Sequence, residues 1–129
     1  MQFPFKIVSR RYLRAPHRVS FKHAWNGVKH AFDSQPNFRF HVLIFTLVII
    51  SGIYLKIDVL AFVVIFLAAS IVFSMEMLNT ALEALSDEVA DGKYKDLIKV
   101  AKDVAAGGVL ISAIFAVLIG LIVFIPYLL

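Results

Sequence analysis

Three long runs of apolar residues occupy most of the chain after residue 41, and short polar connections separate them. The first run covers residues 42–55, the second covers residues 59–85 with polar groups in its last third, and the third covers residues 104–129 without a charge. A bilayer core of about 30 Å needs about 20 helical residues. The second and third runs therefore predict membrane-spanning helices. The first run is of borderline length, and the tight polar turn at residues 56–58 favours a two-span hairpin with the second run. The alternative is an interfacial hairpin arm.

A different pattern precedes these runs. Between Val19 and Phe32, apolar residues recur at helical spacing on one face, and polar residues occupy the other face. This pattern predicts an amphipathic helix lying in the membrane surface, with Trp25 as an interfacial anchor. Pro36 disfavours helix at Gln35, so we expect the surface helix to end near Ser34. The alternative is that the whole arm is only a tether.

We therefore expect an all-α membrane protein with two parts. Residues 1–37 form the basic N-terminal arm with its surface helix, and residues 38–129 form a three-span transmembrane domain. The spans are expected at about 38–57, 59–87 and 104–129, with residues 86–103 forming a segment at the cytoplasmic surface.

The composition agrees with a membrane protein. The 129 residues are 60% apolar and 17% charged, with a mean hydropathy of +0.85, whereas soluble domains are about 45–50% apolar and about 25% charged. The chain has no cysteine, which excludes a disulfide scaffold, an iron–sulfur cluster and thiol chemistry.

The basic residues predict the orientation. Eight of the 13 lysines and arginines lie in the first 41 residues, and four more lie in residues 86–103. Basic segments face the cytoplasm, so the N-terminus is predicted to be cytoplasmic. No long apolar run follows Met1 in this stretch, so we do not expect a secretory signal peptide. Phosphate binding by a basic arm does not need a membrane domain, and we expect no nucleic-acid partner.

Small residues recur at every fourth position of the third run, at Gly108, Ser112, Ala116 and Gly120. Such a stripe allows helices to approach closely in lipid. Because three helices alone cannot enclose a pocket, the stripe predicts a homo-oligomer.

The candidate chemistry lies at the end of the second run, where Glu76, Asn79, Glu83 and Asp87 share one helical face. By length, Glu76 falls near the cytoplasmic boundary of the bilayer and Asp87 projects beyond it. Carboxylates on one face can bind Mg²⁺ together with substrate phosphates, and a boundary carboxylate can act as general base toward a lipid hydroxyl. This arrangement predicts phosphate chemistry at the membrane surface. The alternative is a solvated helix end with surface ion pairs. The four histidines, His17, His23, His30 and His41, are interpreted as interfacial.

The sequence E-M-L-N-T-A-L-E from Glu76 to Glu83, then Asp87, then A-K-D-V-A-A-G at residues 101–107, forms a long pattern. It resembles the prokaryotic diacylglycerol kinase/undecaprenol kinase family, small trimeric membrane enzymes unrelated to soluble kinases. The resemblance covers the chain from about Ser20 to its C-terminus. It implies ATP- and Mg²⁺-dependent phosphorylation of a lipid alcohol in the bacterial inner membrane, by a homotrimer with active sites shared between subunits.

The resemblance also implies residue roles. Glu76 would be the general base on the lipid hydroxyl, Asn79 would lie near the transferred phosphate, and Asp87 would support the site. Glu83 would bind magnesium, and Trp25 would border the lipid substrate. The nucleotide would contact Lys102, Asp103, Tyr94 and Lys95, although Tyr94 is also typical of an interface residue.

Two positions depart from the family pattern. Gln35 stands where the family usually has a second metal-binding glutamate, and a neutral amide is a weaker magnesium ligand than a carboxylate. Lys95 stands where a histidine is common. Two other functions remain open: a catalytically lapsed or regulatory membrane subunit, which Gln35 favours, and a lipid phosphate hydrolase.

Overall fold

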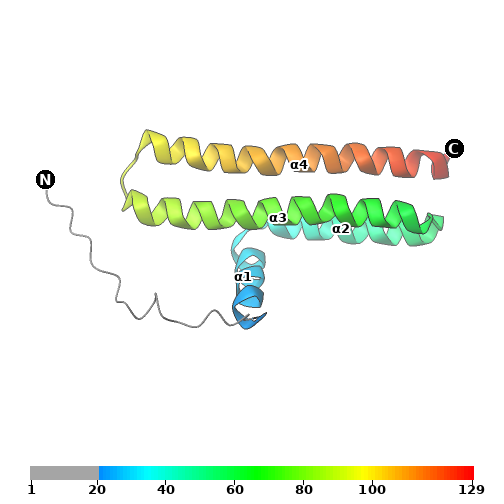
Figure 1. Cartoon of the computed structure of the whole chain (residues 1–129), viewed down its shortest axis with the longest axis horizontal. Coiled ribbons are helices and arrows are strands. Elements are labelled where there is room, and N and C mark those ends of the chain that lie inside the picture. The colour runs from blue at the N-terminus through cyan, green and yellow to red at the C-terminus, as the bar shows by residue number, and fades with distance from the viewer. Residues whose placement is uncertain (1–20) are drawn as a thin grey trace, which may run out of the picture.

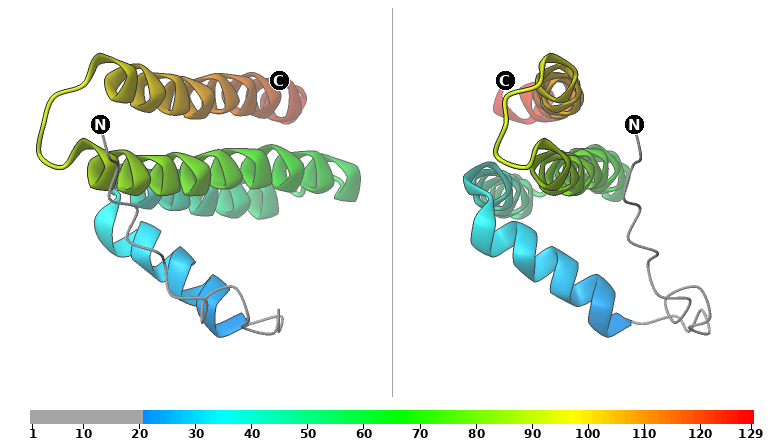
Figure 2. Two further views of the ribbon diagram at one scale, coloured as in Figure 1. Left: turned by 60° about the vertical axis from the view of Figure 1, so that its left-hand side comes forward. Right: turned by 90° about the vertical axis from the view of Figure 1, so that its left-hand side faces the viewer.

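The computed structural model describes residues 21–129, and every regular element in that range is a helix. The helices are α1 (Phe21–Ser34), α2 (Pro36–Leu55), α3 (Val59–Ala90) and α4 (Asp96–Leu128). Helices α2, α3 and α4 run side by side, and α1 leaves the start of α2 at a steep angle (Figures 1 and 2). The basic residues and His17 within residues 1–20 lie outside the described residues.

The corner between α1 and α2 forms as the sequence predicts. Gln35 has an extended backbone and Pro36 occupies the first turn of α2, where its missing N–H costs no hydrogen bond. Arg39 then reaches back from α2, and its Nη1 donates to the carbonyl oxygens of Phe32 and Asp33 at 3.1 and 3.0 Å. These are carbonyls of the last turn of α1, which lack partners within the helix. Arg39 thereby fixes the end of α1 to the start of α2.

The predicted hairpin between the first two runs is present, and side chains at the turn hold it. Lys56 ends α2 in the left-handed backbone region, and Asp58 caps α3 by accepting a hydrogen bond from the Ala61 N–H at 2.9 Å. The hydroxyl of Tyr127, near the end of α4, donates to Asp58 at 2.8 Å. The Ala61 N–H, followed by the Tyr127 hydroxyl, holds the pKa of Asp58 below its ordinary value. All three long helices are thus tied together at this end of the molecule.

The last two helices extend further than the predicted spans. Helix α3 continues to Ala90 and α4 begins at Asp96, so that only residues 91–95 connect them. Asp91 and Gly92 adopt the left-handed conformation in this connection. A helix of 32 residues is about 48 Å long, which exceeds the hydrocarbon thickness. The predicted surface segment at residues 86–103 therefore consists mainly of helical extensions of α3 and α4.

Three helices, α2, α3 and α4, are long and apolar enough to cross a membrane. At most 17% of the apolar window of any of them is buried inside the chain. The remaining apolar surface is of the kind that lipid or other subunits cover.

Part of the small-residue stripe of α4 packs against α3 within the same chain. A Cβ at Gly108 would lie 2.5 Å from Cε of Met75 on α3, and Ser112 is buried. The close approach of α4 to α3 therefore depends on a small residue at position 108. The homo-oligomer stays a prediction.

Candidate active site

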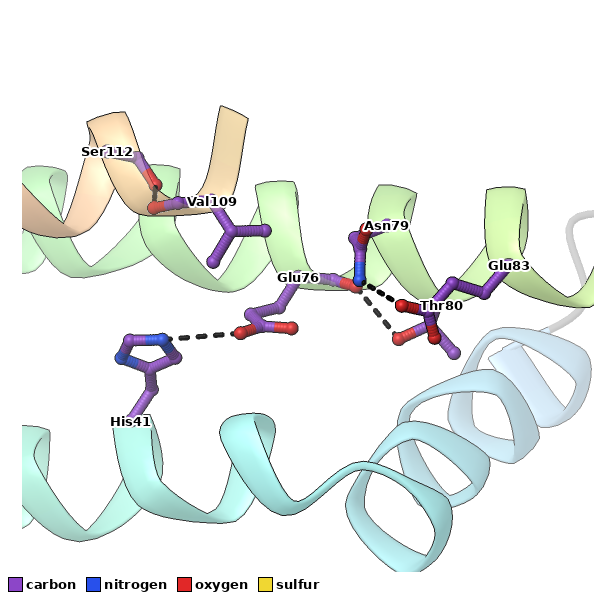
Figure 3. A network of polar contacts seen from close by, with 7 residues as sticks. All are labelled: His41, Glu76, Asn79, Thr80, Glu83, Val109 and Ser112. Carbon is purple, nitrogen blue, oxygen red and sulfur yellow. Dashed lines mark hydrogen bonds and ion pairs between the residues drawn. The ribbon is translucent and has the colours of Figure 1, made fainter. Parts of the chain in front are cut away.

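A row of polar side chains lies on the face of α3 that turns toward α2 and the α1–α2 corner (Figure 3). Glu76 is the most deeply buried, with 1% of its surface exposed, and Asn79 and Thr80 are also buried. Thr80 satisfies its hydroxyl locally by donating to the carbonyl oxygen of Glu76. Burial of a carboxylate is costly unless it is paired, so the neighbours of Glu76 define what this site can do.

The neighbour that contacts the Glu76 carboxylate is His41 of α2. Its Nε2 lies 3.2 Å from Oε1 of Glu76, and 19% of the His41 side chain is exposed against 2% for Glu76 (Figure 3). His41 was not predicted as a site residue, because all four histidines were interpreted as interfacial. A usable signal was present: in a hairpin that turns at residues 56–58, His41 and Glu76 are about equally far from the turn.

A second polar cluster surrounds Glu83, which lies on the same face of α3 as Glu76, about two turns further along the helix. Asn79 Nδ2 donates to Oε1 of Glu83 at 3.0 Å, and Gln35 Nε2 donates to Oε2 at 3.2 Å. The α1–α2 corner thus places Gln35 next to Glu83, although 48 positions separate them in the sequence. The family resemblance implied a role in the site for each of Gln35, Asn79 and Glu83. The fold brings these three residues into direct contact.

The Glu83 cluster consists of oxygen-bearing side chains, the type of ligand that magnesium prefers. Within residues 21–129, no group of three or more His, Cys, Asp or Glu side chains is arranged to hold a metal ion. Magnesium, however, commonly uses one or two carboxylates together with substrate phosphates. Glu83 offers one carboxylate, and Asn79 and Gln35 carry amide oxygens beside it. The Asn79 Oδ1 is buried without a hydrogen-bond partner in the described structure. The set fits a magnesium ion that is completed by nucleotide phosphates.

The candidate nucleotide residues lie at the far end of α3 and the start of α4. Lys102 Nζ pairs with Asp87 at 2.8 Å, so the fold brings these two predicted residues together. Asp103 instead pairs with Lys99 on its own helix. Lys95 donates to the carbonyl oxygen of Val89, and Tyr94 is 76% exposed. Lys95 therefore holds the connection between α3 and α4.

Trp25 lies on α1 and is 68% exposed. A groove between α1, α2 and α3 is lined by Val28, Phe32, Phe38, Val42, Phe73, Ser74 and Met77, and does not include Trp25. In the isolated chain, Trp25 is available to contact the membrane or another molecule.

Comparison with known proteins agrees with this architecture. The family model described as "Prokaryotic diacylglycerol kinase" matches residues 22–124, which is most of the chain. The chain belongs to the prokaryotic diacylglycerol kinase family, a class of bacterial membrane lipid kinases.

Three relatives illustrate the family. A diacylglycerol kinase of Synechocystis is 43% identical over 111 residues, which cover 86% of this chain and 63% of the relative. An undecaprenol kinase of Bacillus subtilis is 38% identical over 107 residues, which cover 83% and 86% of the two chains. A diacylglycerol kinase of Escherichia coli is 29% identical over 96 residues, which cover 74% and 78%. The chain thus spans just under two thirds of the Synechocystis protein and most of the other two.

Proposed function

We propose that this protein transfers the γ-phosphate of Mg·ATP to the hydroxyl group of a membrane lipid alcohol, undecaprenol or diacylglycerol. The observation that carries the proposal is the buried carboxylate of Glu76 on α3, followed on the same face by the Glu83 cluster. Glu76 lies beside the apolar part of α3, where a base can meet a lipid hydroxyl. The oxygen-rich Glu83 cluster lies further along the helix, where a charged phosphate donor can bind.

In this proposal the polar groups act in the order in which they follow one another along α3. Glu76 takes the proton of the lipid hydroxyl, and Asn79 lies next to the transferred phosphate. Glu83, with help from the amide of Gln35, would hold magnesium, which when bound would supply positive charge to the phosphate oxygens. From Glu76 to Asp87 the helix rises about 16 Å, which leaves room for a triphosphate between the two residues. Asp87 supports this end of the site, and Lys102, Asp103, Tyr94 and Lys95 bind the nucleotide.

The proposed membrane arrangement places the N-terminus, α1 and the connection at residues 91–95 on the cytoplasmic side of the bacterial inner membrane. Helix α1 lies in the surface as an amphipathic helix, and Trp25 borders the lipid substrate. A homotrimer with shared active sites covers much of the exposed apolar surface of α2, α3 and α4. The exposed apolar side chains of all three helices support this arrangement.

The test is transfer of labelled phosphate from γ-labelled Mg·ATP to lipid by the purified protein in detergent. Undecaprenol and diacylglycerol are offered separately, and Glu76→Gln serves as the blank. We expect transfer to at least one lipid above the blank. Absence of transfer to either lipid would contradict the proposal, and release of phosphate from a lipid phosphate without ATP would favour a hydrolase.

Gln35 is the residue that favours a lapsed or regulatory subunit, and its replacement tests that alternative. We expect Gln35→Glu to preserve or increase phosphate transfer, because it adds a second carboxylate beside Glu83. Without magnesium, this variant should unfold at a lower temperature than the wild type, since the 3.2 Å hydrogen bond to Glu83 is replaced by two like charges. Magnesium should reverse this loss.

Thermal unfolding with and without magnesium, together with the transfer assay, measures both effects. Asn37→Asp is the matched control, because it makes the same amide-to-carboxylate change at an exposed position of the same corner. An inactive wild type whose activity appears only in Gln35→Glu would identify a lapsed kinase.

A further inference from the structure

His41 is a titratable residue in an otherwise apolar wall. It lines a cavity of about 300 Å³ between α2, α3 and α4, and the other lining residues are all apolar, such as Phe45, Val72 and Phe124. A histidine at such a place needs a polar partner. Glu76 is that partner, because its Oε1 lies 3.2 Å from the His41 Nε2.

The surroundings of Glu76 leave this contact without a competitor. The titratable groups that act on it from the packed helices are His41 of α2 and Glu83 of its own helix α3, and α1 and α4 contribute none. Apart from this contact with His41, Oε1 of Glu76 has no polar partner within the described residues. His41 is therefore the group placed to orient this carboxylate.

We propose that His41 is the positioning residue of the general base: the N–H at its Nε2 faces the Glu76 carboxylate and holds it in place for the lipid hydroxyl. The inference rests on the proposed kinase function. During transfer, the lipid oxygen forms its bond to the γ-phosphorus as the bond from that phosphorus to the β-phosphate oxygen breaks and ADP leaves. The hydroxyl proton goes to the Glu76 carboxylate. Glu76 releases this proton after the phosphorylated lipid leaves, and His41 keeps its own Nε2 hydrogen throughout.

Two variants of His41 separate this role from simple packing. His41→Leu removes the donor that orients Glu76, and we expect its kcat to fall about 100-fold, the lower end of the range of general acid–base effects. KM for lipid and for Mg·ATP should stay within about twofold, because the contact is with the base. His41→Gln keeps an N–H donor, so we expect it to recover part of kcat.

The split between kcat and KM supplies a readout that packing would not produce. A general loosening of α2 against α3 should raise KM and lower the unfolding temperature, whereas loss of the His41 donor should lower kcat alone. His30→Leu is the matched control, because His30 lies exposed on α1, and it should behave as wild type.

A second measurement covers the case in which His41→Leu does not fold. The ¹⁵N signals of His41 in the full-length protein should shift in Glu76→Gln, while those of His30 should not. An unchanged kcat in His41→Leu, a kcat of His41→Gln no higher than that of His41→Leu, or identical His41 signals in the presence and absence of the Glu76 carboxylate would each overturn the proposal. Failure of the wild type to phosphorylate any lipid would instead overturn the kinase function, and the ¹⁵N experiment still tests the contact.

Discussion

Glu76→Gln is expected to lower lipid phosphorylation by about 10²- to 10⁴-fold, the contribution of a positioned general base. The amide keeps the shape of the side chain but cannot take the hydroxyl proton. The fold should survive, because the carboxylate makes its one close side-chain contact with His41, and the amide oxygen can still accept from Nε2. The assay is labelled phosphate transfer at saturating lipid and Mg·ATP, with size-exclusion chromatography to measure the oligomer.

Glu88→Gln is the matched control for this experiment. It makes the same chemical change on the same helix, at an exposed position that contacts neither His41 nor the Glu83 cluster. Its activity should equal that of the wild type. If Glu76→Gln instead loses its oligomeric state, Glu76 is a structural residue and the proposed base is wrong.

Glu83→Gln is expected to raise the magnesium concentration needed for half-maximal activity. Loss of a partner in the outer shell of a metal site already costs about 10- to 100-fold in affinity or activity, and loss of the one carboxylate in this cluster should cost at least as much. The measurement is a magnesium titration of the transfer rate at fixed ATP, with excess metal to restore part of the activity.

The hydrogen bonds around Glu83 make its variant easy to interpret. Asn79 and Gln35 both donate to the carboxylate, and the oxygen of a glutamine at position 83 can still accept one of these bonds. The thermal unfolding temperature should therefore change little. A magnesium dependence equal to that of the wild type and of Glu88→Gln would show that Glu83 does not bind the metal.

The sequence was sufficient to predict the helices because their signals are local. The apolar runs, the proline at position 36 and the polar turn near Asp58 each act within a few residues, and the helices begin and end close to the expected positions. The extension of α3 beyond the membrane was expected, to about residue 87, but the start of α4 at Asp96 was not. Hydropathy marks the membrane-embedded part of a helix and not its end. Residues 86–103 contain few helix breakers, and only Asp91 and Gly92 interrupt the helix with left-handed conformations.

The spacing of residues predicted the candidate site along α3 but not the contacts that other helices make with it, and Gln35 entered the site only through the family resemblance. Spacing placed Glu76, Asn79 and Glu83 on one face, since a single helix fixes their relation. The contact of His41 with Glu76, and that of Gln35 with Glu83, depend on how α2 and the α1–α2 corner pack against α3. Such packing depends on tertiary contacts such as that between Phe38 and Phe73, which no local pattern specifies.

The uninterrupted course of α3 through the candidate site has a consequence for substrate selection. A continuous helix fixes the rise from Glu76 to Glu83 at about 10 Å, and the Asp58 cap with the Tyr127 hydroxyl anchors the opposite end of the same helix. In the proposed kinase, the distance from that anchored end to Glu76 therefore sets the depth at which a lipid hydroxyl meets the base. For such an enzyme the rate should depend on bilayer thickness, because in a thicker or thinner membrane the same lipid would present its hydroxyl above or below Glu76.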